Sequence, residues 1–178
     1  MINLDVIKAI DEPTDWCAPI LVVPKPNGEV RICLDLTRLN KGVRQEVYQM
    51  PKVEETLSNI AKGAVFSKLD ANSGFHQVPL SEESAKLTTF ITPFGRYMFK
   101  RLPYGISSAP EFFQKKMDQE LAGLEGVVRH MDNILVFGRN QAEHDQRLSS
   151  VLDRISRCGL TLNPDKCKFS QKRIEYLG

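Results

Sequence analysis

The stretch that decides the fold is an apolar hairpin with an acidic tip, Val127-Val128-Arg129-His130-Met131-Asp132-Asn133-Ile134-Leu135-Val136-Phe137-Gly138. An acidic side chain at the tip of a buried strand pair is costly unless something pairs with it. A divalent cation is one such partner, because it prefers carboxylate oxygens. Asp132 therefore indicates a metal site. The neighbouring Asn133 carries no charge, so it weakens that site.

Composition places the chain among ordinary globular domains. Its 178 residues are 42% hydrophobic and 26% charged, with a formal net charge of +2, which neither requires nor excludes a nucleic-acid partner. No apolar run reaches the roughly 18 residues of a transmembrane helix, so we expect no membrane partner. Charges at Asp5, Lys8 and Asp11 argue against a signal peptide. The four cysteines lack C-x-x-C spacing, which favours reduced thiols in an intracellular protein over a zinc site.

Hydrophobic periodicity and turn residues predict an α+β domain, with helices packed on one face of an antiparallel sheet. Besides the two arms of the opening hairpin, the expected strands are residues 18–23, 30–34, 65–69, 88–91 and 97–101. The expected helices are residues 53–60, 107–122 and 141–158. Asn27-Gly28 supplies the tight turn between the first two strands. The buried stripes of the last two helices are expected to be Phe113, Met117 and Leu121, and Leu148, Val151, Leu152 and Ile155.

Two carboxylates carry the candidate chemistry. Asp70 ends the strand 65–69, and Asp132 follows 62 positions later (132 − 70) in the hairpin turn. If the two strands are neighbours, both carboxylates converge at one end of the sheet and can bind Mg²⁺. Two ions held in this way activate an attacking oxygen and stabilise a leaving pyrophosphate. Spacing alone leaves open the alternative that both residues are turn formers. The motifs of serine hydrolases, P-loop NTPases and zincins do not occur.

Further motifs follow one another in a fixed order along nearly the whole chain. They are Trp16-Cys17-Ala18-Pro19, Arg31–Asp35 with Leu39-Asn40-Lys41, Phe66–Gln77, Leu102–Pro110 with Phe113-Gln114, Met131-Asp132-Asn133, Leu160–Cys167 and Tyr176-Leu177-Gly178. Together they resemble the fingers and palm of the reverse transcriptase of gypsy-type LTR retrotransposons, which are related to retroviral polymerases.

The resemblance implies an RNA-directed DNA polymerase domain within a retroelement polyprotein. The implied fold is that of a right-hand polymerase. Residues 1–64 would be mainly fingers, and residues 65–178 mainly palm with a fingers insertion near 81–103. We expect no thumb, ribonuclease H or integrase segment in the chain. The implied partners are an RNA or DNA template with its primer, deoxynucleoside triphosphates and the remainder of the polyprotein. The implied location is the cytoplasm, in a virus-like particle, or with access to the nucleus.

The resemblance also assigns roles to single residues. Asp70 and Asp132 would hold Mg²⁺ or Mn²⁺ together with the carbonyl of Ala71, and Asn133 occupies the third catalytic position. The residues implied to bind the nucleotide are Lys25, Arg31, Phe75, Tyr104, Gly105 and Lys166. Among these, Lys25 and Arg31 would clamp the triphosphate, Phe75 would exclude a 2′-hydroxyl, and Lys166 lies near the position that protonates pyrophosphate. Gln114 would border the template strand.

The chain departs from the family pattern at three positions. Asn133 replaces the second aspartate of the hairpin, which removes one of three carboxylates and predicts a severe loss of polymerisation. His130 stands where a tyrosine is common, and Thr37 where an arginine is usual. Three alternatives therefore stay open. The first is an impaired polymerase. The second is a non-catalytic nucleic-acid-binding remnant or co-opted host protein, whose phosphate contacts would come from Lys100, Arg101, Lys115 and Lys116. The third is a decayed insertion without activity.

Overall fold

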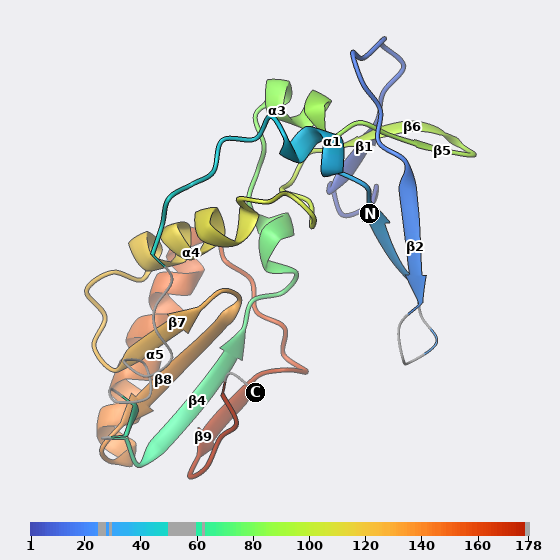
Figure 1. Ribbon diagram of the computed structural model, residues 1–178. Helices are drawn as coiled ribbons and strands as arrows, with labels where there is room; N and C mark the ends of the chain where they lie inside the picture. The colour runs from blue at the N-terminus through green and yellow to red at the C-terminus, as the bar shows by residue number, and fades with distance from the viewer. Residues whose placement is uncertain (25–27, 29, 50–59, 62, 177–178) are drawn as a thin grey trace. The chain divides into compact units, whose positions relative to one another are not determined.

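The computed structural model describes residues 1–24, 28, 30–49, 60–61 and 63–176, which form two compact units (Figure 1). Unit 1 comprises Met1–Glu46 and Phe75–Ala109, and unit 2 comprises Val47–Gly74 and Pro110–Gly178. The expected insertion near 81–103 belongs to unit 1. The described residues among 47–64, which were expected with the fingers, belong to unit 2.

Unit 2 is built on a four-stranded antiparallel sheet with the strand order β7-β8-β4-β9 (Figure 1). The strands are β4 Val65–Asp70, β7 Val127–His130, β8 Asn133–Gly138 and β9 Lys168–Gln171. The predicted hairpin and the predicted strand that ends at Asp70 are both confirmed, and they are neighbours. Strand β9 was not predicted, because its four residues are all exposed and show no apolar alternation.

Helix α5, Gln141–Cys158, packs against β8 and β4 and has the predicted bounds. The Asn140 side chain caps it by accepting a hydrogen bond from the Glu143 N–H. Gly159 ends it with φ +72, a left-handed conformation that favours glycine. The buried face is narrower than predicted, because Leu152 is 36% exposed.

A buried polar pair joins this helix to the sheet. The Ser67 and His144 side chains are fully buried, with Ser67 Oγ 2.8 Å from His144 Nε2. The Ser170 N–H donates to the same Oγ at 3.0 Å, which ties β9 to the pair. Gly138 permits the close approach, because a Cβ there would lie 2.5 Å from the His144 backbone nitrogen.

Helix α4, Ala109–Glu120, matches the predicted helix at 107–122 to within two residues at each end. Its predicted stripe of Phe113, Met117 and Leu121 is buried as expected. Gln114 is also fully buried, although glutamine is a polar residue.

Unit 1 contains two small antiparallel sheets. One has the order β1-β6-β5 and consists of β1 Ile7–Ala9, β5 Phe90–Thr92 and β6 Gly95–Phe99. The other pairs β2 Ile20–Pro24 with β3 Val30–Leu34, as predicted for the first hairpin. Three short helical segments accompany them, α1 Thr37–Asn40, η1 Gly74–Gln77 and α3 Glu82–Leu87. The core includes the buried side chains of Ala18, Leu34, Leu36, Phe90 and Phe99.

Local capping explains where unit 1 departs from prediction. Strand β5 begins at Phe90 rather than residue 88, because Thr88 is the C-cap of α3 and its hydroxyl donates to the Ala85 carbonyl at 2.7 Å. Helix α3 itself was not predicted, although Ser81 caps it by accepting from the Ser84 N–H. The helix expected at 53–60 falls almost entirely outside the described residues.

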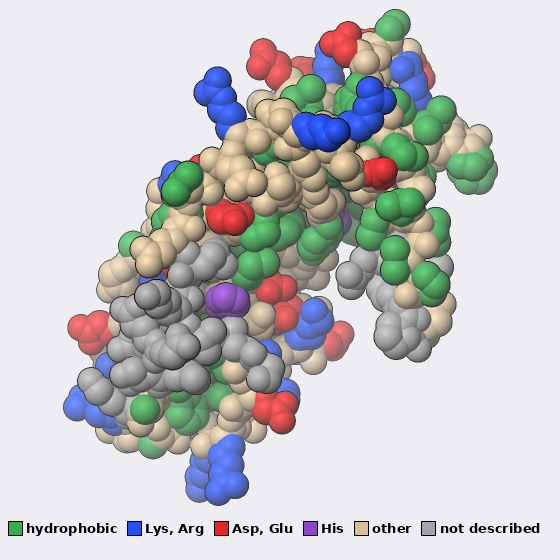
Figure 2. Space-filling view, viewed as in Figure 1, with side chains coloured by type: hydrophobic (Ala, Val, Ile, Leu, Met, Phe, Trp, Pro, Cys, Tyr) green, Lys and Arg blue, Asp and Glu red, His purple; other side chains and the backbone are tan. Residues whose placement is uncertain are grey.

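The surface carries both signs of charge. On the face shown in Figure 2, acidic and basic side chains lie interspersed over the coloured atoms rather than forming one continuous patch. All four cysteines have free thiols. In the part of the chain that the structure describes, no helix combines the length and the apolar character needed to cross a bilayer.

Candidate active site

The two aspartates predicted to bind metal lie side by side at one end of the unit 2 sheet. The β4–β8 register runs from Val65 opposite Gly138 to Asp70 opposite Asn133. One residue further along, the Ala71 N–H donates to the Asp132 carbonyl at 2.8 Å. Because the strands are antiparallel, the end of β4 meets the hairpin turn directly. The sequence prediction that these strands are neighbours is therefore confirmed.

The Asp70 side chain is buried and incompletely paired. The residue is 7% exposed, and its Oδ1 atom accepts no hydrogen bond from any described group. The Lys166 ammonium lies 3.4 Å from this oxygen as an ion-pair partner. A buried carboxylate oxygen without a donor is costly unless another cation completes its surroundings.

Lys166 reaches Asp70 because a tight turn is hydrogen-bonded to the end of β4. The Asn163 N–H donates to the Asp70 carbonyl at 2.8 Å, and the Asn72 N–H donates to the Thr161 carbonyl at 2.9 Å. Within the turn, the Lys166 N–H donates to the Asn163 carbonyl at 3.2 Å. The turn thus places an ammonium group beside the buried carboxylate.

Asn133 faces Asp132 with its amino group. Its Nδ2 donates to Asp132 Oδ1 at 3.0 Å. A carboxylate at position 133 would repel Asp132, whereas the amide satisfies it without any cation. Among the described residues, no group of three or more His, Cys, Asp and Glu side chains is placed to hold a metal ion.

The turn that carries Asp132 has an unusual backbone. His130 pairs with Asn133, so Met131 and Asp132 form a two-residue turn, and Met131 has φ +53. Asp132 is not among the residues with positive φ, and a positive φ at the first turn residue alone is the pattern of a type II′ turn, where glycine is preferred. The turn therefore holds a methionine in a conformation that costs free energy.

Gln114 contacts this turn from α4. Its Oε1 accepts from the Met131 N–H at 2.7 Å, and its Nε2 donates to Asp118 Oδ2 at 3.1 Å and to the Arg129 carbonyl at 3.3 Å. The structure thus shows the Gln114 amide in hydrogen bonds within unit 2. Its contact with the template strand stays a prediction.

Three of the described nucleotide-binding candidates, Phe75, Tyr104 and Gly105, lie in unit 1, whereas Lys166 lies in unit 2. The Phe75 and Tyr104 rings stack with centroids 5.1 Å apart. Gly105 has φ +102, and its carbonyl accepts from Asn40 Nδ2 at 2.8 Å, while Asn40 Oδ1 accepts from the Ser107 N–H at 2.9 Å. The sequence analysis assigned no individual role to Asn40, whose side chain holds this loop through both hydrogen bonds. The feature that could have indicated it is a polar side chain at the end of the short helix α1.

The remaining candidates are less defined. Lys25 lies outside the described residues, and Arg31 lies in β3 opposite Val23, with its backbone described. The metal contact of the Ala71 carbonyl stays a prediction.

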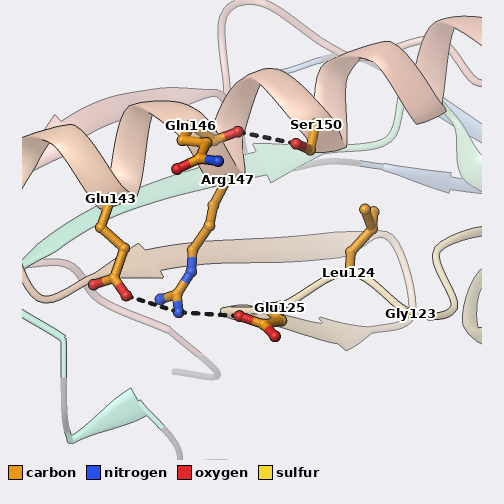
Figure 3. Close-up of a pocket in the computed structure, with 7 residues that line it drawn as sticks. All are labelled: Gly123, Leu124, Glu125, Glu143, Gln146, Arg147 and Ser150. Carbon is orange, nitrogen blue, oxygen red and sulfur yellow. Dashed lines mark hydrogen bonds and ion pairs between the residues drawn. The ribbon is translucent and has the colours of Figure 1, made fainter.

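A hollow of about 370 Å³ elsewhere in unit 2 does not involve the candidate site residues (Figure 3). Arg147 points into it and pairs with Glu143 at 3.0 Å and with Glu125 at 3.8 Å. The guanidinium also donates to the Phe137 carbonyl at 2.9 Å. Hydrogen bonds from Arg139, helped by Arg147, hold the pKa of Glu143 at about 2. These groups satisfy one another, so the hollow is a structural junction.

Fold and site together define a class of protein. A four-stranded antiparallel sheet with helix α5 packed on it and aspartates meeting at one end is the architecture of a polymerase palm. The chain belongs to the reverse transcriptase family, because residues 23–178 match the model described as reverse transcriptase (RNA-dependent DNA polymerase).

Similar curated proteins include a transposon polyprotein and an uncharacterized nematode protein. The Transposon Tf2-7 polyprotein of Schizosaccharomyces pombe is 33% identical over 162 residues, which cover 90% of this chain and 12% of the polyprotein. The uncharacterized protein K02A2.6 of Caenorhabditis elegans is 34% identical over 166 residues, covering 92% of this chain and 13% of that protein. The chain thus spans 12–13% of the length of these curated relatives.

Solved structures give the same result. The foamy viral protease-reverse transcriptase in complex with double-stranded DNA superposes with a TM-score of 0.91 and 25% identity, covering 99% of this chain and 31% of that one. The same viral enzyme in complex with an RNA/DNA hybrid gives a TM-score of 0.88 and 25% identity, covering 97% and 23%.

Proposed function

We propose that this chain is the fingers and palm of an RNA-directed DNA polymerase within a retroelement polyprotein of the gypsy-type LTR class. The observation that carries the proposal is the meeting of Asp70 and Asp132 at one sheet end, where the Ala71 N–H bonds to the Asp132 carbonyl. The proposed partners are a primed RNA or DNA template, deoxynucleoside triphosphates and the rest of the polyprotein. The proposed place of action is the cytoplasm, within a virus-like particle.

The donor set fits a divalent cation. Asp70 offers a buried oxygen that accepts no hydrogen bond, and Asp132 supplies a second carboxylate from the adjoining turn. Hard oxygen ligands of this kind suit Mg²⁺ and Mn²⁺. Asp70 and Asp132 would hold the ion, with the Ala71 carbonyl as a further ligand. When bound, the ion neutralises phosphate oxygens and lowers the pKa of the attacking hydroxyl.

The other groups of the chain would position the substrate. Lys166 is proposed to donate a proton to the pyrophosphate, because its ammonium already lies near the metal-binding carboxylate. Phe75 is proposed to select deoxynucleotides by occupying the space of a 2′-hydroxyl, and its stacking on Tyr104 restricts its movement. Lys25 and Arg31 are proposed to bind the triphosphate.

Asn133 is proposed to reduce the activity of this copy severely. The amide brings no negative charge, and its amino group already bonds Asp132 Oδ1, an oxygen that a cation would use. Electrostatic stabilisation is the largest contribution in phosphoryl transfer. Losing one of three carboxylates is therefore expected to slow the phosphoryl-transfer step itself.

The direct test is primer extension with Mg²⁺ or Mn²⁺, comparing the wild type with Asn133→Asp. Both proteins are measured as the 178-residue chain and as a longer protein that includes the sequence following it in the proposed polyprotein. We expect Asn133→Asp to raise extension by about 10²–10³-fold, the usual effect of one electrostatic group. Asp70→Asn in the Asn133→Asp background is the negative control. If Asn133→Asp gives no gain, the metal-site assignment is wrong.

A non-catalytic nucleic-acid-binding remnant is the second candidate, and Asn133 favours it. Its proposed phosphate contacts are partly occupied, because Lys100 forms an ion pair with Asp5, and Lys116 pairs with Glu120 at 3.3 Å. Filter binding of a primer–template at low salt tests this candidate. Binding that weakens steeply with salt supports it, and an absence of binding at low salt removes it.

A further inference from the structure

Gln114 is a fully buried residue beside the hairpin that carries Asp132. We propose that Gln114 is the positioning residue for Asp132: its amide clamps the Met131 N–H and so fixes the turn from which Asp132 binds metal. The inference rests on the proposed function only in its last step, the binding of metal. The clamp on the turn can be tested without metal.

The turn needs such a clamp. Met131 is held at φ +53, a backbone angle that residues other than glycine adopt at a cost in free energy. The local sequence therefore does not favour this conformation. The N–H that Gln114 accepts belongs to that residue, immediately before Asp132. Holding this amide therefore fixes the backbone that carries the carboxylate.

The orientation of the Gln114 amide is determined by its partners. Nε2 faces two acceptors, Asp118 Oδ2 at 3.1 Å and the Arg129 carbonyl at 3.3 Å. Oε1 faces a donor, the Met131 N–H, at 2.7 Å. A flipped amide would place oxygen against oxygen on one side and N–H against N–H on the other, so one orientation satisfies the site.

Asp118 is in turn fixed from two other segments. Its Oδ1 pairs with Arg129 Nε at 3.0 Å, and its Oδ2 accepts from the Tyr48 hydroxyl at 2.8 Å. That hydrogen bond raises the pKa of Tyr48, as expected for a hydroxyl that donates to a carboxylate. The chain of contacts from Tyr48 through Asp118 and Gln114 to Met131 makes the clamp rigid.

The experiment compares Gln114→Met, which keeps the size of the side chain but removes its hydrogen bonds, with Gln119→Met on the exposed side of the same helix. The first readout is amide hydrogen exchange at Met131 in the metal-free 178-residue protein. The second is Mn²⁺ affinity measured by electron paramagnetic resonance. We expect faster Met131 exchange and about tenfold weaker Mn²⁺ binding in Gln114→Met, the usual effect of losing a group behind a metal ligand. Gln119→Met should change neither.

Each outcome decides the proposal. A protected Met131 amide in folded Gln114→Met overturns the clamp, and faster exchange with unchanged Mn²⁺ affinity overturns the positioning role. If Gln114→Met does not fold, Asp118→Leu replaces it, because leucine offers no acceptor to the Gln114 Nε2 group. Asp118→Leu should speed Met131 exchange in the same direction, and unchanged exchange again overturns the clamp. A wild-type protein that binds no Mn²⁺ refutes the proposed metal site, while the exchange measurement still decides the clamp.

Discussion

Replacing Asp70 by asparagine should stabilise the metal-free protein. The Asp70 carboxylate is 7% exposed, and its Oδ1 accepts no hydrogen bond. An unsatisfied buried polar group costs about 1–3 kcal/mol and a charged one costs more, so the neutral amide of asparagine in the same place costs less than the carboxylate. The Lys166 ion pair offsets part of that cost, by up to about 1 kcal/mol, since the lysine side chain is 61% exposed. Asp70→Asn should therefore raise the free energy of unfolding by about 1–2 kcal/mol.

The assay is thermal and urea unfolding with EDTA and then with saturating Mn²⁺. In EDTA, a gain of this size raises Tm by about 2–8 °C for a chain of this length. With Mn²⁺ at about 100 times its Kd, the wild type gains about 2.7 kcal/mol and the order reverses. Asp153→Asn, an exposed position on α5, is the matched control and should be neutral. An Asp70→Asn variant that is less stable than the wild type in EDTA would refute the reasoning.

Three further predictions concern stability in unit 2. Ser67→Ala leaves His144 Nε2 buried without its hydrogen-bond partner and should lower the free energy of unfolding by about 2 kcal/mol, measured by urea unfolding. Ser149→Ala on the exposed face of α5 should change it by less than about 0.5 kcal/mol. Gly138→Ala places a Cβ 2.5 Å from the His144 backbone nitrogen and should lower the free energy of unfolding by about 3 kcal/mol. Gly42→Ala is the control and should be tolerated, because its Cβ lies 3.6 Å from the nearest atom, and equal losses of stability would contradict the contact argument. The pKa of Glu143 is lowered from 4.5 to about 2, so its contribution is present above pH 4.5 and is lost as the pH falls toward 2. The difference in free energy of unfolding between wild type and Glu143→Gln should therefore shrink over that interval in acid titrations. A constant difference would show that the Glu143 ion pairs do not stabilise the folded protein.

Local signals made much of unit 2 predictable. Helix α5 begins and ends as predicted because Asn140 and Gly159 are strong caps at its two ends. The strand that ends at Asp70 and the hairpin that carries Asp132 follow from their apolar runs. The resemblance then placed Asp70 and Asp132 at one site, and the strand register brings their backbones together.

What the sequence did not predict depends on contacts between distant segments. The hydrogen bonds of Gln114 were not predicted, because two of its partners are backbone groups 15 and 17 positions further along the chain, besides the Asp118 side chain. Such hydrogen bonds leave no periodic pattern. Helix α3 and strand β9 were also unexpected. A helix of six residues and an exposed strand of four bury too few side chains to give a periodic hydrophobic pattern.

The backbone pairing around Asp70 has a consequence for the history of this gene. Asn133 still stands opposite Asp70, and the Ala71 N–H still bonds to the Asp132 carbonyl. The impairment that we propose for Asn133 is therefore chemical rather than architectural. Asparagine and aspartate codons differ at their first base alone, so a single nucleotide change separates this copy from the full set of carboxylates that the resemblance implies. On the proposed function, such a change would restore the site without altering the fold.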